Sequence, residues 1–352
     1  MRDIKELYEL LDASTSDAQT MHILFDIATF FLNTDEERTT AVANDLKELA
    51  EKLDSNLGRC YYHSTLGRQL FRKSRYEEAS AEFQMALQLS LLTDDKLMQA
   101  MCYDSIGVVC NPLNQNELAL EMAFKALALY EQIPGKASEW QKGVCYNNIG
   151  TCYKNLGLLE KAEEAYLLGL KVIEQTPNDR MKYNLMSNLG GLKIEHGQYD
   201  EALDYLLPAI EGFKMLKHKI GELHSLVYLA QCYFERGDDA AALIHYLSVL
   251  RELKSVEHKL TEINALQGMG NVYSKMQAYP EAIAQFEKAL SIAVATAHHK
   301  EACKCYIYLA QAYKAMGNPP AATDALDRGI AFATEKNLLP DLETLKKERA
   351  EV

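Results

Sequence analysis

Small and apolar residues recur along the chain at the spacing of one face of an α-helix, and the whole pattern repeats about every 40 residues. A glycine or alanine stands at the centre of each copy, at positions 67, 107, 150, 190, 230, 270 and 310. Counted from this small residue as position 0, mostly apolar side chains occupy positions −4, −1 and +3. These offsets lie on one side of a helix, so the pattern predicts seven helices of one type.

A second amphipathic segment follows each of these helices and carries an alanine at position +12. These alanines are Ala79, Ala119, Ala162, Ala202, Ala242, Ala282 and Ala322. Four residues later most copies have a bulky residue: Phe83, Tyr166, Leu206, Tyr246, Phe286 and Leu326. Glycine at +7 in four copies predicts the left-handed turn that ends the first helix. Each copy is therefore expected to be a helical hairpin that buries its apolar faces by stacking on its neighbours.

The repeated sequence resembles the tetratricopeptide repeat. The motif YNNIGTCYKNLG at residues 146–157 carries the resemblance, together with residues 190–202 and 270–289. The resemblance covers about residues 58–335 and implies an all-α fold, a right-handed α-solenoid of stacked antiparallel helical hairpins. Because the period exceeds the usual value of about 34 residues, longer helices are expected. Long-helix versions occur in kinesin light chains, spindle-orientation adaptors and bacterial peptide-sensing regulators.

Both ends of the chain fit the repeat less well than residues 58–335 do. Residues 1–57 are expected to form a degenerate eighth hairpin or an N-terminal helical cap. Residues 336–352 are expected to form a short charged helix, which either caps the array or connects it to a further domain. The predicted organisation is therefore an N-terminal segment, seven repeats and a C-terminal helix.

Two irregularities lie within the array. In the 107 repeat, Cys110 and Asn114 replace an aromatic residue and a glycine, and Pro112 predicts that the first helix ends early or kinks. The next interval is 43 residues instead of 40, and the three additional residues predict a longer loop around residues 134–140.

Charge and hydropathy narrow the range of partners. The net charge is −13, with 50 acidic and 37 basic residues, which argues against nucleic acid as the main partner. No run of about 18 apolar residues is present to span a membrane, and the charged N-terminus lacks the apolar core of a signal peptide. A cytoplasmic location is therefore predicted. Several of the eight cysteines share repeat positions, which predicts reduced cysteines that fill small spaces between helices.

By resemblance, the first helix of each hairpin lines a binding groove with positions −6, −3, −2, +1, +4 and +5. Many of these positions carry amides, and each amide can both donate and accept a hydrogen bond to the backbone of an extended peptide. The predicted peptide-binding residues are Asn147, Asn148, Lys154, Asn184, Asn188, Tyr228, Gln231, Asn264, Gln267, Asn271, Tyr308 and Gln311. The alternative is a solvated polar helix face, although amides form helices less readily than Glu or Lys.

Sequence patterns for a dinucleotide site, a metal site or a chaperone-binding site are weak or absent. Gly268-Met269-Gly270 lacks the third glycine of a dinucleotide loop, and Cys303 and Cys305 have the wrong spacing for a zinc pair. His298 and His299 could touch a metal but also fit a solvated turn. The −3 positions lack the Lys and Arg of the carboxylate clamp that chaperone-binding members of the family use.

No spaced set of nucleophile, base and orienting residue is evident, and no cofactor or metal is expected. The sequence therefore predicts a non-catalytic scaffold that binds a protein or an extended peptide. The alternative is a sensory module of a bacterial signalling protein, either a peptide receptor or the input domain of a kinase or nucleotide cyclase. The sequence leaves open whether the chain forms a homo-oligomer through its terminal helices.

Overall fold

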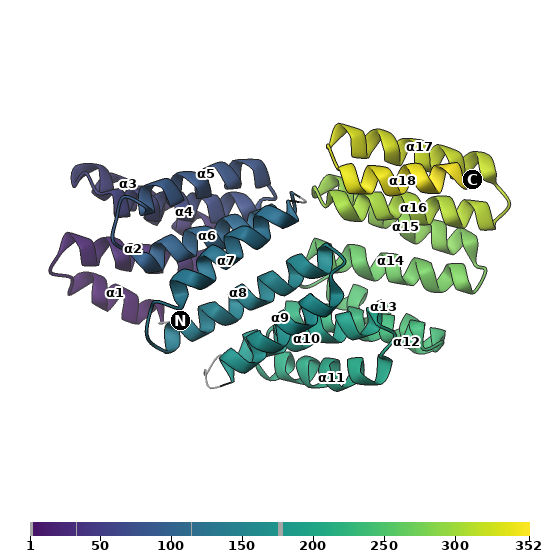
Figure 1. Cartoon of the computed structure of the whole chain (residues 1–352), viewed down its shortest axis with the longest axis horizontal. Coiled ribbons are helices and arrows are strands. Elements are labelled where there is room, and N and C mark those ends of the chain that lie inside the picture. Colours follow the sequence, from purple (N-terminus) through teal and green to yellow (C-terminus); the bar gives the residue numbers. More distant parts are fainter. Residues whose placement is uncertain (1–2, 33, 114, 175–178) are drawn as a thin grey trace. The chain divides into compact units, whose positions relative to one another are not determined.

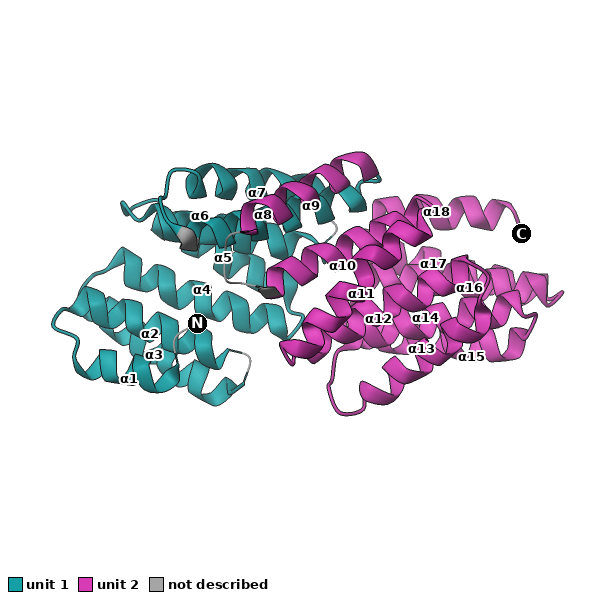
Figure 2. Ribbon diagram, turned by 90° about the horizontal axis from the view of Figure 1, so that it is seen from below, with its two compact units in different colours: residues 1–158 teal, residues 159–352 magenta. Residues whose placement is uncertain are grey.

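The computed structural model describes residues 3–32, 34–113, 115–174 and 179–352 and contains helices but no strand within these ranges. The chain divides into two compact units, residues 1–158 and 159–352, with the boundary between α8 and α9 (Figures 1 and 2). Within each unit, consecutive helices pack against one another as antiparallel hairpins. The predicted all-α architecture of stacked hairpins is thus confirmed.

The described residues of the first unit form eight helices. They are α1 (Ile4–Asp12), α2 (Asp17–Phe31), α3 (Glu36–Lys52), α4 (Asn56–Arg72), α5 (Tyr76–Ser90), α6 (Lys96–Cys110), α7 (Asn116–Tyr130) and α8 (Lys136–Asn155). The helices α4 and α6 carry the small residues of the first two repeats, and they pair with α5 and α7.

Ten helices lie within the part of the second unit that the structure describes. They are α9 (Leu159–Ile173), α10 (Asp179–Glu195), α11 (Tyr199–Met215), α12 (Lys219–Glu235), α13 (Asp239–Glu252), α14 (Lys259–Lys275), α15 (Tyr279–Ala295), α16 (His299–Ala315), α17 (Pro319–Glu335) and α18 (Leu339–Ala350). The first helices of its repeats, α10, α12, α14 and α16, each contact the next in the series.

The repeat alanines and the bulky residues that follow them close each hairpin. All seven alanines are at most 1% exposed. The bulky residue of the second helix lies against the small residue of the first, so a Cβ atom added to Gly190 would come 2.5 Å from Leu206 Cγ. A Cβ atom added to Gly270 would come 2.3 Å from the Phe286 ring. The small residue therefore makes room for the large one, which explains why both recur with the same period.

The predicted turns are confirmed. Gly157, Gly197, Gly237 and Gly317 end their first helices with φ angles between 73° and 87°. In each of these turns, the backbone N–H of the following residue bonds to a carbonyl in the last helical turn, as Asp238 N does to Tyr233 O at 2.9 Å. This left-handed conformation costs glycine little, because glycine has no Cβ atom.

The 107 repeat is irregular in the expected way. Helix α6 ends at Cys110, three residues after its glycine, whereas α4 ends at Arg72, five residues after its own. Pro112 has no backbone N–H to continue the helix, which accounts for the early end. Asn114 lies outside the described residues.

The expectation of a longer loop around residues 134–140 is wrong. The loop before α8 spans only residues 131–135, and α8 is 20 residues long, three more than α10 or α12. The three additional residues therefore extend the helix. A helix absorbs extra residues by adding a turn at its exposed end, so an insertion placed between two helices does not have to enter the loop.

The two ends of the chain are helical. In the N-terminal segment, α2 and α3 pair, and Ile27 and Leu46 are completely buried in the same cluster as Leu7 of α1. At the other end, α18 packs on α16 and α17 and buries Leu345. The division of the chain at residues 57 and 335 stays a prediction.

All eight cysteines are buried and none is in a disulfide. The Sγ atoms of Cys60 and Cys102, on α4 and α6, lie 3.7 Å apart across the junction of two repeats. Burial raises the pKa of several of these thiols, including that of Cys110 to about 11, because a thiolate is poorly solvated between packed helices. The thiols therefore serve as small apolar fillers, as their repeat positions predict.

Candidate functional site

Four amides form a stripe along the first helices of the second unit. Asn184 on α10 and Asn264 on α14 occupy position −6, and Gln231 on α12 and Asn271 on α14 occupy position +1. Positions −6 and +1 are seven residues apart, about two helical turns, and therefore lie on the same side of a helix. Because α10 contacts α12 and α12 contacts α14, these four residues, here called the amide stripe, lie on three neighbouring helices.

The amide stripe has unused hydrogen-bonding capacity. Its four side chains are half-buried, and none forms a hydrogen bond with another of the residues that the structure describes. Polar side chains that are partly withdrawn from water usually have a partner. The arrangement therefore leaves a row of donors and acceptors that can serve a ligand.

Helix α18 lies beside the next position in the series. Gln311, at +1 of α16, donates from Nε2 to Glu348 Oε2 of α18 at 3.4 Å. Lys314 donates from Nζ to the carbonyl oxygen of Glu351 at 2.6 Å. The hydrogen-bonding groups of Gln311 are thus partly used within the protein, and the stripe of unused amides ends at α14.

The prediction that Gln267 lines the groove is wrong. Gln267 is only 7% exposed, and its amide donates to the carbonyl oxygen of Glu301 at 3.1 Å and to Cys305 Sγ at 3.2 Å. Both partners belong to the next repeat. Gln267 therefore joins two repeats, and its amide is not available to a ligand.

This contact is repeated along the array, because the residue at −3 of one repeat meets the residue at −5 of the next. The pairs are Ser64 with Cys102 at 4.0 Å, Asp104 with Cys145 at 3.2 Å, Ser187 with Ser225 at 2.9 Å and Gln267 with Cys305 at 3.2 Å. Ser64, Ser187 and Ser225 are all buried. At these positions the −3 side chain therefore packs between repeats.

The remaining predicted residues are half-buried and lie in two groups. Asn147, Asn148 and Lys154 lie on α8 in the first unit. In the second unit, Asn188, Tyr228 and Tyr308 occupy position −2 on α10, α12 and α16. The two tyrosines are packed as well as accessible. The Tyr228 ring covers Gly191, and the Tyr308 ring lies 5.3 Å from that of Phe286.

Comparison with protein families decides the classification. A model described as the tetratricopeptide repeat matches residues 181–254 and 261–335, and a second model of the same description matches residues 144–176. Together these matches cover more than half of the chain. The protein belongs to the tetratricopeptide repeat family. No curated protein matches the sequence.

Solved structures resemble this tetratricopeptide repeat protein over almost its whole length. A Rap protein complexed with Competence and Sporulation Factor has a TM-score of 0.70 and 16% identity, covering 98% of this chain and 91% of that one. The apo form of the quorum sensor NprR from B. thuringiensis has a TM-score of 0.68 and 14% identity, covering 93% and 91%. Aspartyl phosphate phosphatase F from Bacillus subtilis has a TM-score of 0.65 and 14% identity, covering 94% and 92%. At these identities the likeness concerns the fold alone.

The weak motifs fit within the tetratricopeptide repeats. Gly268 and Gly270 lie inside α14, under the rings of Tyr246 and Phe286. His298 bonds through Nδ1 to Thr296 Oγ1 at 2.8 Å, and the His299 ring stacks on Phe332. Among the described residues, no three His, Cys, Asp or Glu side chains gather as metal ligands would, and no helix is long and apolar enough to cross a bilayer.

Asp104 is an acidic repeat residue whose ionisation is perturbed by packing between repeats. Its carboxylate accepts hydrogen bonds from the Tyr130 hydroxyl at 2.9 Å and from the Cys145 thiol at 3.2 Å. Burial raises the pKa of Asp104 to about 6. The two hydrogen bonds favour the charged form and lower the pKa, but burial has the larger effect. The same burial raises the pKa of Tyr130 and Cys145, so both stay protonated below neutral pH.

The raised pKa makes stability depend on pH in a defined direction. A carboxyl group whose pKa is higher in the folded state binds its proton more tightly there, so its stabilising effect is present at low pH and is lost as pH rises through about 6. We expect the unfolding free energy of the wild type, minus that of Asp104→Asn, to increase as pH falls from 7 to 5. Urea unfolding at both values measures this difference. A difference that is constant or decreases would contradict the assignment.

Two pockets lie away from the predicted groove. One, of about 560 Å³, is lined by residues of α15, α16 and α17. The other, of about 960 Å³, is lined by α13, the start of α14, the loop between them and Lys288 of α15. Sequence reasoning missed both because it assigned ligand binding to first helices only. The available signal was Ile244, a large apolar residue at a position where other repeats have alanine or an acid.

Proposed function

We propose that this tetratricopeptide repeat protein is a non-catalytic receptor for an extended peptide, which it holds across α10, α12 and α14 by the amide stripe. The observation that carries the proposal is that Asn184, Gln231, Asn264 and Asn271 are half-buried, lie on one side of neighbouring helices and form no hydrogen bond with the described residues.

The spacing of the helices suits a peptide backbone. Packed helices lie about 8–10 Å apart, and an extended chain advances about 3.3 Å per residue. Amides on neighbouring helices would therefore meet a peptide about every third residue. Each amide can pair with a backbone N–H or C=O, whichever the peptide presents, so this recognition tolerates many sequences. Tyr228, beside the stripe on α12, adds an aromatic surface for an apolar peptide side chain.

The names of similar structures support a peptide ligand and a regulatory role. The Rap protein is complexed with Competence and Sporulation Factor, NprR with its cognate peptide NprX, and the Rap conjugation gene regulator of plasmid pLS20 with the Phr* peptide. These structures share the fold of this chain and support a peptide ligand.

Removing two amides of the stripe is expected to weaken peptide binding with no loss of helicity. Linear peptides selected by display on the immobilised protein would serve as probes, and their Kd would be measured for the wild type and for Gln231→Ala with Asn271→Ala. Each lost hydrogen bond contributes about 0.5–1.5 kcal/mol, so the double variant should bind about 5- to 150-fold more weakly.

The matched control is Gln285→Ala, which removes a half-buried amide from α15, a second helix outside the stripe. This variant should bind the selected peptides as tightly as the wild type. If the double variant keeps wild-type affinity, or if Gln285→Ala weakens binding as much, the amide stripe is not the binding site.

A further inference from the structure

The larger pocket is an elongated groove between two second helices of the repeat array. Along α13 its lining runs from Ile244 to Arg251, about 10 Å at the rise of a helix, and continues through Lys254 in the following loop. Lys288 of α15 lies on the other side, and no Cα atom of α13 lies within 8 Å of one in α15. None of the four residues of the amide stripe lines this groove, so it is a separate surface.

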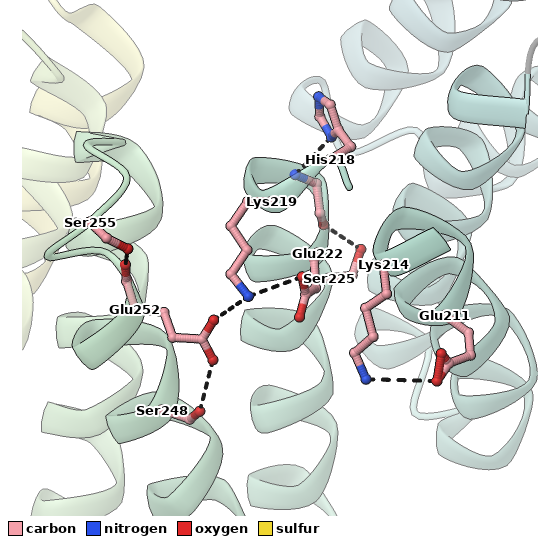
Figure 3. A network of polar contacts seen from close by, with 10 residues as sticks. Glu211, Lys214, His218, Lys219, Glu222, Ser225, Ser248, Glu252 and Ser255 are labelled. Atoms are coloured by element: carbon pink, nitrogen blue, oxygen red, sulfur yellow. Dashed lines mark hydrogen bonds and ion pairs between the residues drawn. The ribbon is translucent and has the colours of Figure 1, made fainter. Parts of the chain in front are cut away.

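Helix α13 ends early beside the groove. Helix α13 has 14 residues, whereas α11, α15 and α17 have 17 each, and a loop from Leu253 to His258 replaces its last turn. Figure 3 shows what holds this end in place. Ser255 Oγ donates to the carbonyl oxygen of Glu252 at 2.8 Å, and Lys219 pairs with both Glu252 and Glu222. The short helix is thus tied to the start of α12 by defined contacts.

The rim of the groove exposes apolar side chains. Ile244 is 66% exposed and Leu247 is 51% exposed, while Leu250 and Leu253 lie deeper. Ile244 occupies position +14, where the other six repeats have Ala81, Glu121, Glu164, Asp204, Ala284 and Asp324. Packing within a hairpin therefore does not call for a large apolar residue at this position. An exposed apolar surface of this kind is typical of a binding site.

The charge around the groove is basic, although the whole chain has a net charge of −13. The acidic residues of the lining, Glu257 and Glu262, both pair with Lys259, at 2.9 Å and 3.5 Å. Arg251, Lys254 and Lys288 form no ion pair within the described part of the chain. Glu252, next to Arg251 in sequence, is already held by Lys219.

We propose that this groove binds an acidic amphipathic helix of a partner protein. Apolar residues of the helix would cover Ile244, Leu247 and Leu250, and its acidic residues would meet Arg251, Lys254 and Lys288. About two turns of helix match the length of the lining on α13. The proposal does not depend on peptide binding at the amide stripe, because the two surfaces share no residue.

A pair of model peptides tests both parts of the proposal. One is a fluorescein-labelled 14-residue helix with Leu at helical spacing and Glu elsewhere, and the other has Lys in place of every Glu. We expect the Glu peptide to bind the full-length protein and the Lys peptide to bind at least tenfold more weakly. Leu247→Asp and Ile244→Asp should each weaken binding of the Glu peptide at least tenfold, and Lys254→Glu with Lys288→Glu should abolish the preference for it.

Leu167→Asp on α9 is the matched control, because Leu167 is an exposed residue at the same repeat position, +17, as Leu247. It should leave binding unchanged. Ile244→Asp is expected to fold, since Asp204 and Asp324 occupy its position in other repeats, and circular dichroism checks this. Equal binding of both peptides, binding of neither, or an equal effect of Leu167→Asp would overturn the proposal. So would a wild-type dimer, detected by sedimentation, that Leu247→Asp dissociates, because the occupant would then be a second copy.

Discussion

Replacing Phe286 with alanine is expected to lower the free energy of unfolding by about 3–5 kcal/mol, the usual cost of deleting a buried aromatic side chain. The Phe286 ring is 1% exposed, lies over Gly270 and packs beside Tyr308 of the next repeat. Because Gly270 has no side chain, it cannot fill the cavity that the substitution leaves. Urea unfolding followed by circular dichroism measures the loss.

Phe124→Ala provides a control for the loss of stability in Phe286→Ala. Phe124 lies on α7 in another second helix but is 45% exposed, so Phe124→Ala removes less buried surface. We expect this control to lower the unfolding free energy by at most about 2 kcal/mol, because part of the ring is already in water. Similar losses for the two variants would show that the ring over the repeat glycine is not a main source of hairpin stability.

Enlarging Ala282 to leucine is expected to cost about 1–3 kcal/mol, the range for adding methylene groups to a packed core. Ala282 is completely buried where α15 lies against α14. Leucine is as good a helix former as most residues, so the loss would come from packing and not from helix propensity. Thermal or urea unfolding of the variant measures it.

Ala284, two residues further along α15, provides the control for this substitution. It is exposed, so Ala284→Leu makes the same chemical change on the same helix outside the core. We expect the control to have nearly wild-type stability. If Ala282→Leu is as stable as Ala284→Leu, then close approach of the two helices does not require the repeat alanine.

Much of the fold could be predicted because each hairpin is defined by short-range features. The small residue at 0, the alanine at +12 and the bulky residue at +16 contact one another within one hairpin, as Gly190, Ala202 and Leu206 do. The glycines at +7, such as Gly197, specify a backbone conformation that other residues rarely adopt. These signals recur in copy after copy, so each supports the others.

The candidate site could be predicted only in part. Asn184, Gln231, Asn264 and Asn271 stay candidates because the structure leaves their amides without partners among the described residues. Gln267 carries the same functional group on the same set of helices, yet its amide is used to join two repeats. Which side of a helix faces the next repeat depends on the angle between hairpins. The periodicity within a single helix gives no information about that angle.

The groove beside α13 could not be predicted from the sequence, for a related reason. Ile244 and Arg251 look like ordinary residues of an amphipathic helix, and nothing local shows that α13 ends at Glu252. Lys219, which is more than 30 residues earlier, reaches Glu252 at this end across the hairpin. Contacts of this kind arise only when two helices have been brought together.

The sequence by itself determined the hairpin, its register and the turns between its helices, because these follow from side-chain size and backbone freedom at fixed spacing. It also determined that α6 is the irregular first helix, since a proline cannot continue a helix. The tertiary structure alone decided which polar positions join one repeat to the next and where a second helix ends early. Those features depend on contacts between neighbouring repeats. The physical reason is that side chains from both repeats pack together at each junction, so the outcome depends on several residues at once.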